Sequence, residues 1–329
     1  MKLVIITPAA AGSRAGNRAT AERWKALLEA SGHQVSVITE YRGEACDAFV
    51  ALHAWHSRAA IQLFRKNWPE TPLLVALTGT DIYHHQLQYP ADTNASMAAA
   101  DILIGLHCFV AQDIPGEYSN KLVTLYQSAD SIQRPPGSTR PDGTFNVCVI
   151  GHLRDEKDSL RAALAARLLP ADSHIRILCA GKPYNTGWQR AAEAEMQKNP
   201  RFQWLGELSG ADTKRLMINS QVMVISSIME GGANVVSEAC RAGLPVIASD
   251  ISGNRGLLGE DYAGYYPVGD EQALAARLHR AETDPEFLNK LSQQVNQLAP
   301  LFCPDNEQRT LELALRKAIQ NCAARNSAC

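Results

Sequence analysis

The 329-residue chain lacks any apolar run close to the roughly 18 to 20 residues that a membrane-spanning helix needs. It also lacks the charged start and apolar stretch of a secretory signal peptide, because Met1 and Lys2 lead directly into a short β-branched segment. From both absences we expect a cytoplasmic protein with no membrane partner.

A strong excess of positive charge is missing too. The formal net charge is −2, whereas a protein that binds DNA or RNA usually presents a strongly basic face. The eight cysteines are scattered, and no two of them form the Cys-x-x-Cys pair typical of compact metal or redox sites. We therefore expect no nucleic-acid partner, and we interpret the cysteines as reduced thiols.

What the chain does have is an alternation of short apolar runs with amphipathic segments, within a hydrophobic content of 46%. This alternation is typical of α/β proteins in which helices cover parallel sheets. The predicted strands, about six in each half, are 3–7, 34–39, 48–52, 73–77, 102–106, 122–125, 146–150, 175–180, 202–205, 222–226, 245–248 and 264–266.

A stretch rich in proline, glycine and polar residues, Ser131 to Thr144, separates the two halves. We predict a first domain over residues 1–130, a linker over 131–144 and a second domain over 145–305. Residues 306–329 have the pattern of a helix that is able to cross back to the first domain. In open α/β sheets ligands bind beyond the carboxyl ends of the strands, so two such sheets facing across a cleft would share one site.

The most informative motif is the segment from Ser227 to Ala239, in which two glutamates stand eight positions apart around a glycine turn. A predicted strand precedes it and a helix follows, so Gly231 and Gly232 leave room for a ligand beside the free N–H groups of the helix start. Such a terminus favours diphosphate or sugar oxygens, while Glu230 and Glu238 can contact a hexose and a ribose. The segment indicates a nucleotide-sugar site; alternatively, Glu230 caps the helix and Glu238 is a solvated surface residue.

The loop after the first predicted strand, Pro8 to Trp24, is rich in glycine, serine and alanine. Its backbone N–H groups can converge on a phosphate-sized anion, to which Arg14 and Arg18 could offer forked guanidinium groups. The loop matches neither the dinucleotide fingerprint nor the P-loop, and a solvated loop is the alternative.

The segment from Gly151 to Asp158 follows the first predicted strand of the second domain. Arg154 and Lys157 are candidates to hold a leaving diphosphate, because fixed cations stabilise the negative charge that develops on the departing oxygen. The alternative is a loop whose mixed charges pair with one another.

Two more predicted strands of the first domain end in polar residues at the edge where a ligand is expected. Gly79, Thr80 and Asp81 follow one strand, and His53 and His56 follow the other. Such side chains can position an acceptor or bond to sugar hydroxyls. A histidine at a strand end also often has a purely structural role.

Two other patterns in the sequence are weaker. The pair His84 and His85 lacks acidic or thiol partners at metal-ligand spacing, and we interpret it as surface. The glycine-rich segment 253–259 indicates either a turn or a sugar contact.

Together these features resemble the GT-B glycosyltransferases of glycosyltransferase family 4, which have two Rossmann-like α/β domains with parallel sheets facing across a cleft. The two-half layout and the two glutamates around Gly231–Asn234 carry this likeness. More narrowly, nearly the whole chain resembles the selenosugar synthases of selenoneine biosynthesis. The strings that carry the narrower resemblance are GNRATAERW, VALHAWHS, ALTGTDIY, GHLRDEKD, MEGGANVVSEA and ASDISGNRGLLGEDYAGYYPVGD.

The family resemblance implies roles for individual residues. Glu238 would bind the ribose hydroxyls, Glu230 the sugar hydroxyls and Lys157 the diphosphate. His152 stands where the family usually has an arginine, and Arg154 is a candidate to compensate. The implied catalytic residues are thus Glu230, Lys157 and Arg154, and the implied donor-binding residues are Gly231, Gly232, Ala233, Asn234, Val235, Glu238 and His152. The predicted acceptor-binding residues are Gly12, Arg14, Asn17, Arg18, His53, Gly79, Thr80 and Asp81.

The narrower resemblance implies transfer of a hexosyl group from UDP-N-acetylglucosamine or UDP-glucose to selenophosphate, which forms a carbon–selenium bond before phosphate is lost. Selenophosphate is an anion with a soft nucleophilic selenium, so the reaction requires no dedicated base. We expect no cofactor and no metal, because cationic side chains and a helix terminus can serve the diphosphate. The alternatives are a conventional retaining glycosyltransferase with a hydroxyl acceptor, a noncatalytic UDP-sugar binder, and an epimerase.

Overall fold

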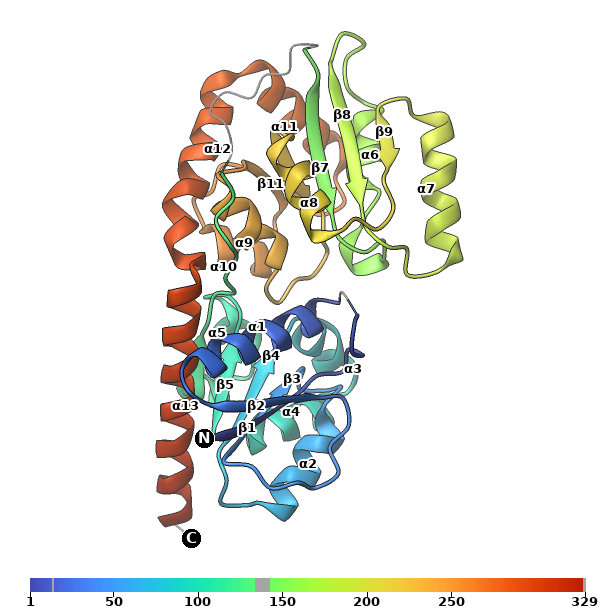
Figure 1. Ribbon diagram of the computed structural model, residues 1–329. Coiled ribbons are helices and arrows are strands. Elements are labelled where there is room, and N and C mark those ends of the chain that lie inside the picture. Colours follow the sequence, from blue (N-terminus) through green and yellow to red (C-terminus); the bar gives the residue numbers. More distant parts are fainter. Residues whose placement is uncertain (14, 134–142, 328–329) are drawn as a thin grey trace. The chain divides into compact units, whose positions relative to one another are not determined.

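The computed structural model describes residues 1–13, 15–133 and 143–327 of a chain that divides into two compact units. The first unit contains Met1–Ser128, Glu230–Ala233 and the segment from Pro304 onwards. The second unit contains Ala129–Met229 and Asn234–Cys303. Each unit holds one parallel β-sheet with helices packed around it (Figure 1).

Within the described residues, the first unit has a six-stranded parallel sheet in the order β2-β1-β3-β4-β5-β6. Its strands are β1 (Lys2–Ile6), β2 (Gln34–Ile38), β3 (Ala48–Leu52), β4 (Leu73–Leu77), β5 (Ile102–Gly105) and β6 (Leu122–Thr124). Its helical segments before the last helix are α1 (Gly16–Ala30), α2 (Arg58–Asn67), the π-helical turn η1 (Asp81–His85), α3 (Gln86–Gln88), α4 (Pro90–Ala99), α5 (Val110–Asp113) and η2 (Gly116–Lys121).

The central strands of this sheet are almost wholly apolar because both of their faces are covered. Alternate residues of β1 point to opposite faces. Leu3 and Ile5 join Trp24 of α1 in one core cluster, whereas Val4 and Ile6 join side chains of α2 in the other. The carboxyl ends of β3 and β4 are neighbours in the sheet, so the polar loops that follow them start side by side.

The last helix, α13 (Pro304–Ser327), belongs to the first unit and packs on α1, β4 and β5. Its start carries Glu307, a fully buried carboxylate. That carboxylate accepts hydrogen bonds from Arg23 Nε at 2.8 Å, Trp24 Nε1 at 2.8 Å and Ser128 N at 2.7 Å. One buried carboxylate therefore ties the start of α13 to α1 and to the chain after β6.

The described residues of the second unit form a six-stranded parallel sheet in the order β12-β11-β10-β7-β8-β9. Its strands are β7 (Phe145–Ile150), β8 (Ile175–Ala180), β9 (Phe202–Trp204), β10 (Val222–Ile225), β11 (Val246–Ser249) and β12 (Tyr265–Tyr266). Its helical segments are η3 (Asp155–Lys157), α6 (Arg161–Ala166), α7 (Thr186–Lys198), α8 (Gly210–Ile218), α9 (Asn234–Arg241), α10 (Ser252–Leu258), α11 (Glu271–Thr283), α12 (Pro285–Leu298) and η4 (Ala299–Phe302).

The prediction of an α/β protein with two parallel sheets is confirmed, and each predicted strand is present with its ends within one residue of the prediction. The interpretation of residues 253–259 as a turn is wrong, because most of them lie in α10. Small buried residues allow this helix to pack closely. Asn254 Nδ2 donates to the Ser249 carbonyl at 2.9 Å, which ties α10 to the end of β11.

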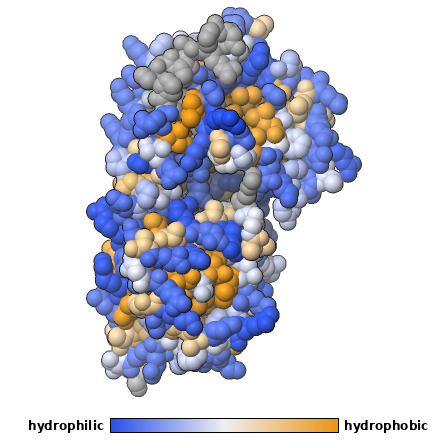
Figure 2. Space-filling view, in the orientation of Figure 1, coloured by the Kyte–Doolittle hydropathy of each residue, from blue (hydrophilic) through white to orange (hydrophobic). Residues whose placement is uncertain are grey.

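The visible face of the protein is mainly hydrophilic, with smaller apolar patches (Figure 2). None of the helices in the described part of the chain is both long enough and apolar enough to cross a bilayer.

Candidate active site

In the second unit, the loop after β7 brings Lys157 back across the end of that strand. The chain turns through η3 and then through Asp158, whose φ of 44° lies in the left-handed region. Two carbons of the Lys157 side chain lie 3.9 and 4.0 Å from the position that a β-carbon on Gly151 would take. These are ordinary van der Waals distances, so the Lys157 side chain lies against Gly151 at the strand end.

The Lys157 loop is hydrogen-bonded to the chain that leaves β10. Ser226 Oγ donates to the carbonyl oxygens of Lys157 and Asp158, at 3.0 and 2.9 Å. Ile228 N donates to the Glu156 carbonyl at 2.9 Å. Because β10 leads through the glycine turn into α9, these bonds hold Lys157 beside the segment that approaches the start of that helix.

Helix α9 presents its polar residues on one face. Val236, Ser237, Ala239 and Cys240 are buried, whereas Asn234, Val235 and Glu238 are partly exposed. Asn234 and Glu238 stand four residues apart, so they lie one above the other on the same side of the helix. A ligand at the start of α9 would thus meet the N–H groups of the first helical turn and the Glu238 carboxylate together.

The β7 loop also carries Arg154 and His152. Arg154 forms an ion pair with its neighbour Glu156, with Nε 3.6 Å from Oε2. His152 is partly exposed, and its carbonyl accepts from Ser159 Oγ at 3.3 Å. The roles of Lys157, Arg154 and His152 stay predictions.

In the first unit, Asp81 shapes the edge where β3 and β4 end. The side chain is fully buried, and its two carboxylate oxygens accept backbone N–H groups of Ala54, Thr78, Gly79 and Ile82 at 2.7 to 3.2 Å. One carboxylate thus orders both loops. The Asp81 carboxylate oxygens already accept hydrogen bonds from backbone N–H groups. The contact between Asp81 and an acceptor substrate stays a prediction.

Replacing Asp81 with asparagine should lower the free energy of unfolding by about 2 to 3 kcal/mol, because an amide nitrogen would then face backbone N–H groups left without acceptors. Urea unfolding measures this change. Asp92→Asn is the matched control, since Asp92 only pairs with Arg58 at 3.4 Å on the surface and should change stability by less than about 1 kcal/mol. Equal stability of the Asp81→Asn and parent proteins would contradict the structural role.

The loop after β1 also differs in detail from the phosphate cradle we predicted. Gly12 is exposed and Asn17 is partly exposed, so both are accessible. The Arg18 guanidinium is paired with Glu22, one helical turn further along α1. Arg14 lies outside the described residues. The anion-binding role of this loop stays a prediction.

Gly231 and Gly232 also have a structural role within the first unit, to which residues 230–233 belong. A β-carbon on Gly231 would clash with the backbone of Thr78 and Gly79, and one on Gly79 would lie 2.5 Å from Gly231 N. Gly232 is similarly close to Leu106, where a β-carbon would lie 2.5 Å from Leu106 Cβ. The sequence pattern suggested that these glycines make space for a ligand, and the structure adds a close backbone approach. Glu230, at the start of this segment, is buried.

A cluster of aromatic and imidazole rings lies beside His53, and we did not predict it from the sequence. His85, interpreted as surface, stacks on Trp55 with ring centroids 4.2 Å apart and an interplanar angle of 15°. His56 lies 4.2 Å from His53 and 5.1 Å from His85. No local pattern pairs residues about thirty positions apart, so only the neighbouring positions of β3 and β4 could have revealed this cluster. His84 is exposed, as expected.

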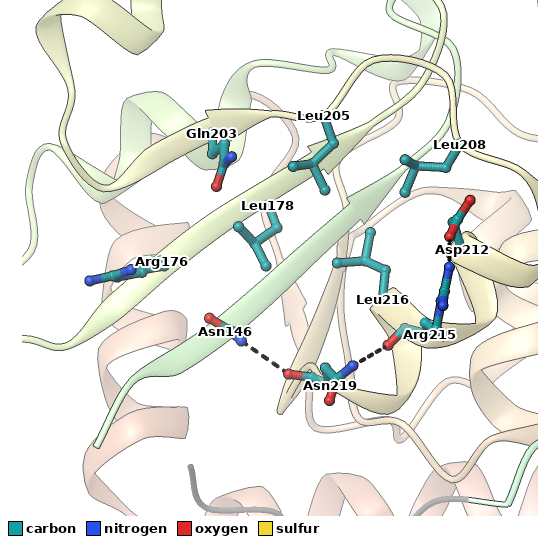
Figure 3. Close-up of a pocket in the computed structure, with 10 residues that line it drawn as sticks. All are labelled: Asn146, Arg176, Leu178, Gln203, Leu205, Leu208, Asp212, Arg215, Leu216 and Asn219. Carbon is teal, nitrogen blue, oxygen red and sulfur yellow. Dashed lines mark hydrogen bonds and ion pairs between the residues drawn. The ribbon is translucent and has the colours of Figure 1, made fainter. Parts of the chain in front are cut away.

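A groove of about 310 Å³ lies on the second sheet, bordered by α8 (Figure 3). Leucines form its floor and polar side chains its rim. Its lining residues are Asn146, Arg176, Leu178, Gln203, Leu205, Leu208, Asp212, Arg215, Leu216 and Asn219. None of them is a predicted site residue, so this groove is separate from the candidate donor site.

Across the described residues, no group of three or more His, Cys, Asp and Glu side chains is arranged to hold a metal ion. The expectation of a metal-independent site stays a prediction.

Comparison with known proteins identifies the family. Residues 131–298, slightly more than half of the chain, match the family model described as glycosyl transferases group 1. The chain belongs to the group 1 glycosyltransferases. Within this glycosyltransferase, the matched range contains the Lys157 loop, the glycine turn and α9.

Solved structures share the fold of this glycosyltransferase over nearly its whole length. HepE of Anabaena, solved in complex with UDP-glucose, is 14% identical with a TM-score of 0.77, and the alignment covers 96% of this chain and 99% of HepE. Sucrose-phosphate synthase from Thermosynechococcus elongatus is 16% identical with a TM-score of 0.78, covering 96% and 98%. The predicted GT-B fold is thereby confirmed.

A sequence relative gives a shorter match. EpsD of Bacillus subtilis strain 168 is 34% identical over 103 residues, which are 31% of this glycosyltransferase. The match spans only about a quarter of the length of EpsD, 26%.

Proposed function

We propose that this glycosyltransferase moves a glucosyl or N-acetylglucosaminyl group from UDP-glucose or UDP-N-acetylglucosamine to selenophosphate. The observation that carries the proposal is the hydrogen-bonded tie between the Lys157 loop and the chain leading to α9. It fixes the backbone of Lys157 against the chain that runs to the start of α9, and a cation together with a helix start suits a leaving diphosphate. The similar fold of HepE, solved with UDP-glucose, supports a UDP-sugar donor.

The proposed reaction breaks the bond between the anomeric carbon and the diphosphate oxygen of the donor. The selenium of selenophosphate supplies the electron pair of the new carbon–selenium bond, and UDP leaves with the electrons of the broken bond. Lys157 and the N–H groups at the start of α9 stabilise the charge on UDP. Water then attacks phosphorus, the phosphorus–selenium bond breaks, and the products are phosphate and a 1-seleno-sugar.

Selenophosphate as the acceptor is supported by the resemblance to selenosugar synthases. The six sequence strings that carry this resemblance extend over both units. Selenophosphate also fits the chemistry of the residues at the acceptor edge of the first unit. Asp81 is occupied by four backbone N–H groups there, so it is poorly placed to deprotonate a hydroxyl acceptor. An acceptor that is already anionic needs no such base.

The test is release of UDP from UDP-glucose and UDP-N-acetylglucosamine with selenophosphate generated in the reaction, under reducing conditions and with EDTA present because we propose no metal. Mass spectrometry should find a seleno-sugar in an amount equal to that of the UDP released. Parallel reactions receive sugar or lipid alcohols, or no acceptor. Turnover with alcohols alone would indicate a conventional glycosyltransferase, and conversion of the donor without any acceptor would indicate an epimerase.

Replacing Glu238 with alanine should weaken the binding of UDP and of the donor by roughly tenfold to a hundredfold, because a charged acceptor of ribose hydroxyl hydrogen bonds is lost. Calorimetric titration with UDP measures the effect. The matched control is Glu193→Ala on α7, whose carboxylate accepts only from Gln189 Nε2 at 2.9 Å on an exposed surface. Unchanged UDP affinity in the Glu238 variant would remove this residue from the donor site.

A further inference from the structure

The edge where β3 and β4 end carries three histidines around Thr80, and their hydrogen bonds fix which nitrogens hold protons. His56 N donates to His53 Nδ1 at 3.0 Å, so Nδ1 holds a lone pair and the proton of neutral His53 is on Nε2. Nε2 lies 2.9 Å from Thr80 Oγ1 and donates to it. The Thr80 hydroxyl proton is consequently directed away from His53, toward any ligand at this edge.

His85 is oriented in the complementary way. Its Nδ1 lies 2.8 Å from the Thr80 carbonyl, which can only accept, so Nδ1 carries the proton and Nε2 holds the lone pair. Trp55 fixes the ring by stacking, and Arg58 covers Trp55 with its Cζ 4.2 Å from the ring centroid. His53 is therefore locked in one tautomer, whereas His85 keeps a nitrogen that can take up a proton.

Desolvation and the neighbouring rings favour the neutral form of these histidines, of which His53 is buried, His85 partly exposed and His56 exposed. Burial lowers the pKa of His53 and of His85, and burial together with the neighbouring His53 and His85 lowers the pKa of His56 to about 4. The other titratable or charged groups around the cluster are Asp81, Arg58 and His84. The Asp81 carboxylate is bound by backbone N–H groups, Arg58 is paired with Asp92, and His84 is exposed.

The His53 backbone adds an independent sign of a built site. Its φ of 74° lies in the left-handed region, which residues other than glycine adopt only with backbone strain. The side chain is 2% exposed, so the surrounding contacts hold the strained residue in place. Strain of this kind concentrates where a side chain must be positioned for a ligand.

We propose that His53, His56, His85 and Thr80 form a phosphoryl-dianion site that binds its anion together with a proton. The Thr80 hydroxyl donates to one oxygen, and His56 or His85 takes up the proton and donates to another. His53 is the positioning residue for Thr80. The inference rests on the proposed function, in which the anion is the phosphoryl group of selenophosphate.

Binding of the anion and uptake of the proton are coupled electrostatically. A dianion within hydrogen-bond distance raises the pKa of an adjacent imidazole, so a ring that is neutral without the anion becomes charged with it. The anion then binds more weakly as the pH rises, because the proton becomes scarcer. Between pH 7 and 8.5 the dissociation constant should rise, by at most about tenfold per pH unit for uptake of one proton.

The test is calorimetric titration of the full-length protein with inorganic thiophosphate, in two buffers that differ in ionisation enthalpy. We expect the apparent binding enthalpy to depend on the buffer, with net uptake of up to about one proton. His56→Asn and His85→Asn should each weaken binding roughly tenfold and, combined, abolish the buffer dependence. Asparagine at position 85 keeps a donor for the Thr80 carbonyl while removing the titratable nitrogen.

His174→Asn is the matched control, because His174 is an exposed histidine of the second unit and should leave affinity and proton uptake unchanged. Thermal unfolding checks that each variant is folded. Proton uptake that survives in the double variant, or that is absent from the parent protein, would overturn the proposal. Since the titration needs no turnover, thiophosphate binding without seleno-sugar formation would refute the proposed function alone.

Discussion

Replacing Lys157 with alanine should lower kcat by about 10² to 10³ while the protein stays folded, because one fixed cation facing the charge that develops on the leaving group contributes at about this level. The side chain lies over Gly151 at the end of β7, and its loop is fastened to the chain leaving β10. Steady-state kinetics with saturating donor and selenophosphate measures the effect.

Two further variants sharpen this result. Lys157→Arg keeps the charge and should recover part of the loss. Lys182→Ala removes an exposed lysine from the loop after β8, whose carbonyl accepts from Leu153 N, and should leave kcat within about twofold of the parent. Parent-like kcat for Lys157→Ala, or equal losses for the two alanine variants, would contradict the assigned role.

Replacing Glu307 with alanine should have the largest effect on stability, a loss of about 3 to 5 kcal/mol in the free energy of unfolding. The carboxylate is fully buried and accepts from Arg23, Trp24 and both the backbone N–H and the hydroxyl of Ser128, so its removal takes the acceptor from four donors and loosens α13 from the rest of the first unit. Urea unfolding followed by tryptophan fluorescence measures the change.

Glu312→Ala on the same helix is the matched control. Glu312 pairs with His33 at 3.0 Å in a partly exposed position, and such pairs contribute less than about 1 kcal/mol. Glu307→Gln keeps an acceptor of similar shape and should fall between the two alanine variants. A Glu307→Ala protein as stable as the control would show that apolar packing alone anchors α13.

The sheets could be predicted from the sequence because their signal is local. Strands such as β3 and β4 are buried on both faces, so five consecutive apolar residues mark each of them. Helix α12 begins at Pro285 and ends just before Pro300, so prolines mark both of its ends in the sequence. At α10 the same reasoning failed, since glycines that usually signal a turn are buried in a helix there.

Some residues of the candidate site could likewise be predicted from local sequence, and others could not. Lys157 and Glu238 follow strand ends and a glycine turn, which are features of local sequence. The stacking of Trp55 on His85 joins two loops whose only link is the adjacency of β3 and β4, so periodicity and spacing give no sign of it. Asp81 was predicted to contact an acceptor, but its carboxylate binds backbone N–H groups. The sequence alone does not distinguish these two roles for a carboxylate at a strand end.

The central claim is that selenium becomes bonded to the anomeric carbon of the transferred sugar. Nuclear magnetic resonance tests this directly when the protein receives UDP-glucose labelled with carbon-13 at the anomeric position and selenophosphate labelled with selenium-77. The account predicts a one-bond coupling between the two labels in the product. A product whose anomeric carbon is attached to oxygen, with the selenium label left in unreacted selenophosphate, would contradict it.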